Sequence, residues 1–311
     1  MPPRKGCSFQ SFDASKFVSF AIQERYTSQQ QFKPIQERGL IQHLDRHVKK
    51  KIKDYKWDVL CDHHEPAVVP MVREFYANGM ERNGFTITVR GKSVPFDRST
   101  INRYYGLANF EDDEYQPLIT NDGTNWEEIK EFLCKDDVPW SRYTNGGLKN
   151  FLGEAMTKVA KIWHHFICAK LLLTTNHSAV MKSRATLIYA ILKDIKIDVG
   201  LIIQHSIIHG FEKGIHGFPH PHLITDLCAN VGVKWNAKEE VRKPKGVIDD
   251  SIVVKIQGGD ALVGASSSSQ VKPGTTQARL EHMEQYMQSK FTYLNQYQHS
   301  MVQYMQSSNL M

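Results

Sequence analysis

A chain of 311 residues with 41% hydrophobic and 10% aromatic residues can bury one sizeable core, which excludes a wholly disordered protein. The formal net charge of +6 permits an anionic partner such as a nucleic acid without requiring one. No stretch approaches the ~18 uncharged apolar residues of a membrane span, and the N-terminus lacks a secretory pattern. The five cysteines are odd in number and widely spaced, which suits a reducing compartment. We therefore expect an intracellular protein, nuclear or cytoplasmic, without a membrane partner.

The N-terminal part of the chain predicts a short tail followed by three helices. Residues 1–14 are polar and contain proline, so we expect disorder there. Helical spacing of apolar residues predicts helices over residues 16–33, 38–56 and from 66 or 67 to 78. The first stops before a proline, and the third ends at an Asn-Gly pair, both common helix boundaries.

The second predicted helix ends in a dense basic run, and this run is the candidate nucleic-acid site. Its members are Arg46, Lys49, Lys50, Lys51, Lys53 and Lys56. Two explanations remain open. Basic residues late in a helix complement its dipole and are usually solvated. The same charges could instead bind RNA or DNA through phosphates and displace counterions.

Alternating apolar and polar residues from 85 to 96 predict a β-hairpin. A two-residue turn of type II′ at residues 91–92 places Val89 opposite Val94. Pro95 confines the second strand to an edge, because proline cannot donate a ladder hydrogen bond.

Three local signals follow the hairpin. We expect a short helix over residues 100–107 capped by Asp97 or Ser99, an exposed acidic loop over 111–123, and a helix that begins after Thr124 or Asn125.

The predicted core lies between residues 155 and 233, where apolar helical segments follow one another with short polar breaks. These segments are 156–173, 179–192, 199–211 and 223–231. The third is apolar nearly all round, which is typical of a helix buried by others on several sides. Asp198 is well placed to cap it.

The C-terminal part changes character twice. Residues 255–276 are rich in glycine and serine and predict a flexible linker, and residues 277–307 predict a Gln- and Met-rich helix. A heptad pattern runs along that helix through Leu280, Met283, Met287, Leu294, Tyr297, Met301 and Tyr304, which we call the seam. Only Lys290 interrupts it. The seam predicts either a coiled coil between copies of the chain or an amphipathic helix that docks on its own domain.

No catalytic signature is visible in the sequence. Phosphate-binding loops, dinucleotide fingerprints and nucleophile elbows are missing, so we predict no catalytic residues and no cofactor. Two groups carry residue types that suit zinc, Cys61 with residues 62–64 and His216 with His220 and His222. Neither has a recognised ligand spacing, and we therefore predict no metal site.

Several sequence words occur in an order that resembles one known family. They are VREFYAN (72–78), VRGK (89–92), VPF (94–96), INRYYGL (101–107), AKIWHHFI (160–167), RA with LIYAI (184–191), IDVG (197–200) and LIT with LC (223–228). Together they resemble the putative plant transposon protein domain family, which is associated with plant retroelements, over roughly residues 17–250. The resemblance implies a retroelement origin and carries over no functional residue.

These observations predict a mainly α, multi-helix globular domain with one small β-hairpin over residues 15–254, plus a C-terminal helix or coiled coil. The leading hypothesis is a retroelement-derived, non-enzymatic protein, capsid-like or nucleic-acid-associated, that self-associates through its C-terminal helix. The alternative is a degenerate transposase or integrase fragment with metal-dependent DNA chemistry. A pseudogene product without retained activity is a third option.

Overall fold

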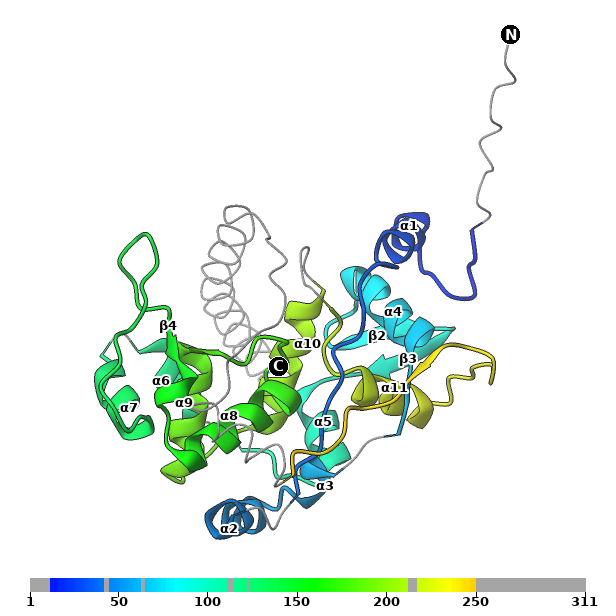
Figure 1. Ribbon diagram of the computed structural model, residues 1–311. Coiled ribbons are helices and arrows are strands. Elements are labelled where there is room, and N and C mark those ends of the chain that lie inside the picture. The colour runs from blue at the N-terminus through cyan, green and yellow to red at the C-terminus, as the bar shows by residue number, and fades with distance from the viewer. Residues whose placement is uncertain are drawn as a thin grey trace, which may run out of the picture.

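The computed structural model describes residues 12–41, 45–62, 65–110, 114–121, 123–211 and 217–249. Within these ranges the protein is rich in helices and has three two-stranded antiparallel sheets (Figure 1). The predicted helix-rich fold is therefore confirmed, and two small sheets are present besides the predicted hairpin. Most of the tail at 1–14, the linker at 255–276 and the helix at 277–307 lie outside the described residues. None of the helices that the structure describes is long and apolar enough to cross a membrane.

Side-chain caps mark the start of three of the five helices described in the first third of the chain. The helices are α1 (Phe20–Ser28), α2 (Arg46–Tyr55), α3 (Asp58–Cys61), α4 (Val69–Asn78) and α5 (Arg98–Tyr105). Helix α2 begins only after Asp45, whose carboxylate accepts from the backbone N–H of His47 at 2.7 Å. The predicted start at Arg38 is wrong, because the described residues 38–41 are not helical. There the N–H of Leu40 donates to the carbonyl of Cys61 at 2.9 Å.

The hairpin is present, but its register differs from the prediction. Strands β2 (Thr86–Val89) and β3 (Lys92–Pro95) pair with Val89 opposite Lys92, and Ile87 lies opposite Val94. The turn residues are 90 and 91, with φ of 48° and 72°, as a type I′ turn requires. The pairing has moved by two residues, so the apolar residues still share one face.

The described residues between 114 and 133 are more helical than predicted. Helix α6 (Tyr115–Thr120) lies within the expected loop, because the Tyr115 ring is buried and its hydroxyl donates to the carbonyl of Ser183 at 3.2 Å. Helix α7 (Trp126–Leu133) begins after Asn125, which accepts from the N–H of Glu128, as predicted.

The core lies where the sequence predicts it. Its helices are α8 (Lys158–Lys170), α9 (Lys182–Leu192), α10 (Val199–Gly210) and α11 (Pro221–Asn230). Short strands β4 (Asn150–Leu152) and β5 (Ala179–Met181) pair before α9, and β1 (Ala67–Val68) pairs with β6 (Val241–Arg242). Two 3₁₀ turns, η1 (Gly79–Glu81) and η2 (Gly153–Ala155), complete the order.

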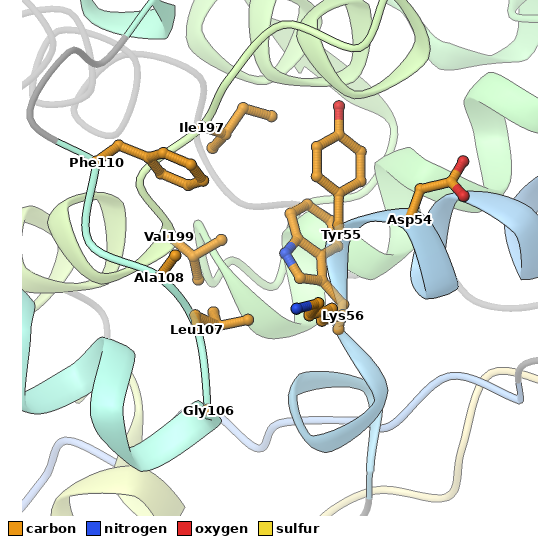
Figure 2. A pocket seen from close by; sticks show the side chains of 10 residues that line it. Asp54, Tyr55, Lys56, Gly106, Leu107, Ala108, Phe110, Ile197 and Val199 are labelled. Carbon is orange, nitrogen blue, oxygen red and sulfur yellow. The ribbon is translucent and has the colours of Figure 1, made fainter.

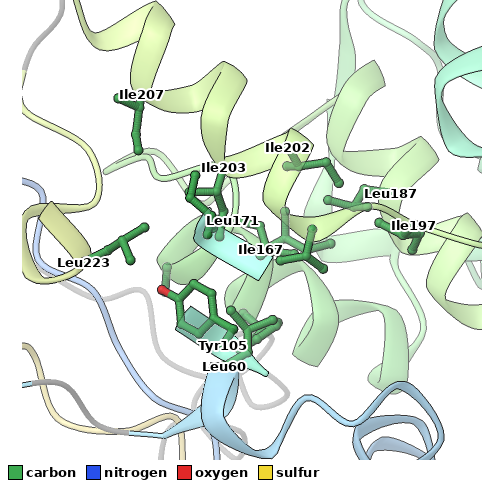
Figure 3. Packing of buried hydrophobic residues seen from close by; sticks show 14 of the residues in the cluster. Leu60, Tyr105, Ile167, Leu171, Leu187, Ile197, Ile202, Ile203, Ile207 and Leu223 are labelled. Carbon is green, nitrogen blue, oxygen red and sulfur yellow. The ribbon is translucent and has the colours of Figure 1, made fainter. Parts of the chain in front are cut away.

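Helix α10 is the centre of this core. Figure 3 shows its Ile202, Ile203 and Ile207 in one buried cluster with Ile167 of α8, Leu171 at the C-cap of α8, Leu187 of α9 and Leu223 of α11. Asp198 caps the helix through the N–H of Leu201 at 3.0 Å, as predicted. Burial on several sides explains why this helix has apolar residues nearly all round.

Candidate nucleic-acid interface

Helix α2 is anchored by two apolar residues and directs its basic residues outward. Val48 and Ile52, one turn apart, are fully buried. Arg46, Lys49 and Lys53 are exposed. Val48 and Ile52 hold the helix against α3 and α8, so Arg46, Lys49 and Lys53 remain on a solvent face.

The six predicted basic residues do not all remain available to a ligand. Lys51 lies largely covered, with its Nζ 2.5 Å from Asp194 Oδ1 and 3.2 Å from the carbonyl of Leu192. The Nζ of Lys50 lies 2.6 Å from Asp54 Oδ2, one turn further along the helix, and this contact raises the pKa of Lys50. These two lysines are therefore compensated within the chain.

The other four basic residues form one stripe. Arg46, Lys49, Lys53 and Lys56 make no ion pair with any residue that the structure describes, and all four are exposed. Their spacings of three, four and three residues place them along one side of the helix. At ~1.5 Å rise per residue the stripe is roughly 15 Å long. We call these four residues the basic stripe.

A cleft of about 180 Å³ opens at the C-terminal end of α2, next to Lys56 (Figure 2). Its apolar walls are Tyr55, Trp57, Leu107, Phe110, Ile197 and Val199. These residues come from three separated segments, so no local motif in the sequence predicts the cleft. The Tyr55-x-Trp57 pair is the only signal that could have drawn attention to it.

The aromatic residues of the cleft are fixed in place. The rings of Tyr55 and Trp57 stack with centroids 4.9 Å apart and planes 24° apart. The Tyr55 hydroxyl lies 3.4 Å from the carbonyls of Ile191 and Ile195. Burial raises the pKa of Tyr55, so the phenol stays protonated and acts as a donor.

A group of histidine side chains lies between α8 and β5. His164 Nε2 is 3.1 Å from the carbonyl oxygen of His177, and the ring of His165 stacks on that of His177 at 5.1 Å and 7°. Burial, followed by neighbouring cations and imidazoles, lowers the pKa of His164 to about 3 and that of His165 to about 4. These imidazoles are therefore neutral at pH 7.

The two groups predicted not to bind metal are only partly described, since His63, His64 and His216 lie outside the described residues. Of the others, His220 Nε2 is 2.9 Å from Ser206 Oγ, and His222 Nδ1 is 2.8 Å from the carbonyl of Glu65. Among the residues that the structure describes, no three histidine, cysteine or carboxylate side chains are arranged to hold a metal ion.

One ion pair lies in the core, and buried lysines with a lowered pKa can act as bases. Lys170 and Glu37 are both fully buried, with 3.8 Å between Nζ and Oε2. Desolvation lowers the pKa of Lys170. Glu37 Oε1 also accepts from the N–H of His222 at 3.1 Å. Both groups lack exposed surface, so a substrate cannot reach them. Their contacts join the N-terminal segment that carries Glu37 to α8 and α11.

Fold and site together define a helix-rich protein that presents an exposed basic helix beside an aromatic cleft. The chain belongs to the family described as putative plant retrotransposon-related domain, which it matches over residues 53–234, more than half of its length. It is therefore a retroelement-derived protein, and the resemblance seen in its sequence is confirmed. Comparison with curated proteins and with solved structures gave no match. The family match begins within α2, at Lys53, and includes all three segments that line the cleft.

Proposed function

We propose that this retroelement-derived protein is non-enzymatic and binds RNA or DNA through phosphates along helix α2. The observation that carries the proposal is the basic stripe. Four exposed cations on one side of a helix have no carboxylate partner among the described residues, whereas Lys50 and Lys51 beside them do. A solvated helix end accounts for the presence of basic residues in α2. It does not account for the position of the four residues without an ion pair along one side of the helix.

Phosphate binding by such a stripe is driven by counterion release. Each phosphate that a lysine or arginine neutralises frees condensed counterions, so affinity falls steeply as salt rises. Up to four contacts predict a slope of log K against log[salt] of roughly −3 to −4. The interaction is independent of sequence, which suits a packaging protein more than a sequence-specific regulator.

The test compares two variants with equal loss of charge. One carries Arg46→Gln, Lys49→Gln, Lys53→Gln and Lys56→Gln. The control carries Lys92→Gln, Lys135→Gln, Lys158→Gln and Lys238→Gln, four exposed lysines outside α2. Fluorescence anisotropy with labelled oligonucleotides between about 50 and 200 mM salt gives affinity and slope. We expect the stripe variant to lose most of its binding and slope, and the control to resemble wild type.

Equal losses in the two variants would show that binding depends on net charge and would reject the stripe as the site. Divalent-metal-dependent nicking of DNA by the purified chain would reject the non-enzymatic part. Single carboxylate substitutions that abolish the nicking would support the transposase or integrase alternative.

We further propose that the seam in residues 277–307 joins copies of the chain. The seam lies outside the described residues, and the proposal rests on its heptad spacing. Several basic stripes in one assembly would raise avidity for a long nucleic acid, as a capsid-like role requires. Sedimentation equilibrium of wild type and of the variant Met287→Asp, Leu294→Asp should give a higher mass for wild type. A wild-type chain that stays monomeric at all concentrations would reject it.

A further inference from the structure

We propose that the cleft beside helix α2 binds one unpaired nucleobase of a nucleic-acid strand whose phosphates lie on the basic stripe. The protein would then prefer single strands to duplexes. This inference rests on the proposed function and adds to it the strand type and the part of the ligand that enters the cleft.

The size of the cleft selects a single ring system. A cavity of about 150 Å³ holds one benzene molecule, so a cleft of about 180 Å³ has room for one planar aromatic group and not for a base pair. Figure 2 shows the Phe110 ring on one side of the opening and Tyr55 on the other, with Leu107 and Val199 below and Ile197 above. Aromatic and aliphatic walls of this kind favour the flat face of a base.

The cleft is preformed, so a ligand need not order it. Trp57 and Val199 are each 2% exposed, and the Trp57 ring also packs against Trp163 at 5.9 Å. The backbone carbonyl of Phe110 accepts from the Arg98 guanidinium at 2.6 Å, which fixes the opposite wall. Side chains that are already immobile lose little entropy on binding.

The positive charges next to the cleft indicate that the aromatic group of the ligand belongs to a polyanion. Lys56 ends the basic stripe and lines the cleft, and Lys53 lies one turn before it. Asp54 also lines the cleft, but its carboxylate accepts from Lys50 at 2.6 Å and is therefore compensated. A groove of cations that continues into an aromatic pocket is the arrangement by which proteins bind single-stranded nucleic acids.

The test uses strands with the same phosphates and different bases. Anisotropy is measured with a short single strand, the same backbone with abasic sites, and the matching duplex, each as DNA and the first also as RNA. We expect wild type to bind the natural single strand roughly ten-fold more tightly than the abasic strand. The DNA and RNA arms then identify which natural strand the cleft accepts.

Two variants remove the pocket by opposite means. Ala108→Phe places a ring at an exposed position on the cleft wall and fills it, whereas Phe110→Leu removes one aromatic wall. Each should abolish the preference for the natural strand and leave abasic binding and its salt slope unchanged. Ala237→Phe, at an exposed position outside the cleft, is the matched control and should keep the preference.

The outcomes separate this inference from the proposed function. If wild type binds natural and abasic strands equally, with a salt slope that depends on the stripe, the cleft does not hold a base and phosphate binding stands. A preference for duplex would also overturn the inference. If no strand binds, both proposals fail. Circular dichroism melting of each variant shows that it folds as wild type does.

Discussion

The guanidinium of Arg90 donates to both carboxylate oxygens of the fully buried Glu74, over 2.8 Å to Oε2 and 2.7 Å to Oε1. The same guanidinium binds the carboxylate of Glu239 over 2.9 and 2.7 Å. Arg90 thereby ties the hairpin turn to α4 and to the segment before β6. A paired arrangement is required here, because a buried carboxylate without a partner is strongly destabilising.

The ion pair between Arg90 and Glu74 predicts that Glu74→Gln lowers the free energy of unfolding by about 3 kcal/mol, since one partner of a buried charge pair loses its charge. Glu239, which is partly exposed, should contribute less, about 1 kcal/mol on substitution to Gln. Urea denaturation followed by circular dichroism measures both. Glu240→Gln, at the neighbouring exposed position, serves as the control and should be near neutral. Similar urea midpoints for Glu74→Gln and Glu240→Gln would contradict a stabilising role of the ion pair between Arg90 and Glu74.

Arg90 also shows where prediction from the sequence stops. Alternation of apolar residues correctly predicts the hairpin and its buried face. It does not predict the turn, because the left-handed φ of Arg90 is maintained by bonds to Glu74 and Glu239, which are 16 and 149 residues away. Local rules favour Gly91 as the first turn residue, and tertiary contacts override them.

The same division applies to the candidate site. The basic run of α2 is visible in the sequence, since charge is a local property. Which of its lysines are compensated is not visible, because Lys51 pairs with Asp194 from another part of the chain. The cleft was not predictable either, as the loop that carries Phe110 meets α2 only in the folded protein. Helix α10, by contrast, was predictable, because a helix buried on several sides has apolar residues nearly all round and this pattern is visible in the sequence.

Close packing at the start of α10 predicts a large effect for Gly200→Ala. A Cβ there would overlap the carbonyl oxygen of Arg98 and lie 2.6 Å from Asn102 Oδ1. The amide side chain of Asn102 also accepts from the N–H of Gly200 at 2.8 Å, so the clash breaks a buried hydrogen bond. We expect a loss of about 3 kcal/mol of stability, against a change within about 0.5 kcal/mol for Gly246→Ala, where the space is open. Equal thermal midpoints would contradict this packing.

The partly buried His165 predicts that stability falls as the pH decreases from 7 to 5. The pKa of His165 is about 4 in the folded chain and close to the ordinary 6.5 when unfolded, so the unfolded state takes up the proton first. The contribution of His165 to stability is therefore fully present above pH 6.5 and is lost as pH falls toward 4. His165 faces His177, with Arg38 and Lys161 nearby, and all these neighbours oppose a positive charge.

Replacing His165 with Phe keeps a ring against His177 and removes the titration. Urea denaturation at pH 7 and pH 5 should show that His165→Phe loses about 1 to 2 kcal/mol less than wild type over this interval, with partial exposure taken into account. His47→Phe, at an exposed position on α2, should retain the wild-type pH dependence. An unchanged dependence in His165→Phe would place the proton uptake elsewhere.

Two neighbouring lysines of α2 should separate stability from binding. Lys51 is 12% exposed and holds Asp194 at 2.5 Å, so Lys51→Gln should cost up to about 1 kcal/mol of stability and leave the salt slope unchanged. Lys53 is exposed and has no ion-pair partner among the described residues, so Lys53→Gln should leave stability unchanged. It should also reduce the magnitude of the salt slope by roughly 0.7 for single strands, the value of one phosphate contact.

The two variants are chemically identical substitutions two residues apart, which makes each the control for the other. Both measurements, urea denaturation and anisotropy against salt, are made on both proteins. A salt slope reduced equally by Lys51→Gln and Lys53→Gln would mean that binding of the strand depends only on the total charge of α2. A salt slope reduced by Lys53→Gln alone would place a bound phosphate on the basic stripe. Lys51 would have no such effect, because its charge is already neutralised by the ion pair with Asp194.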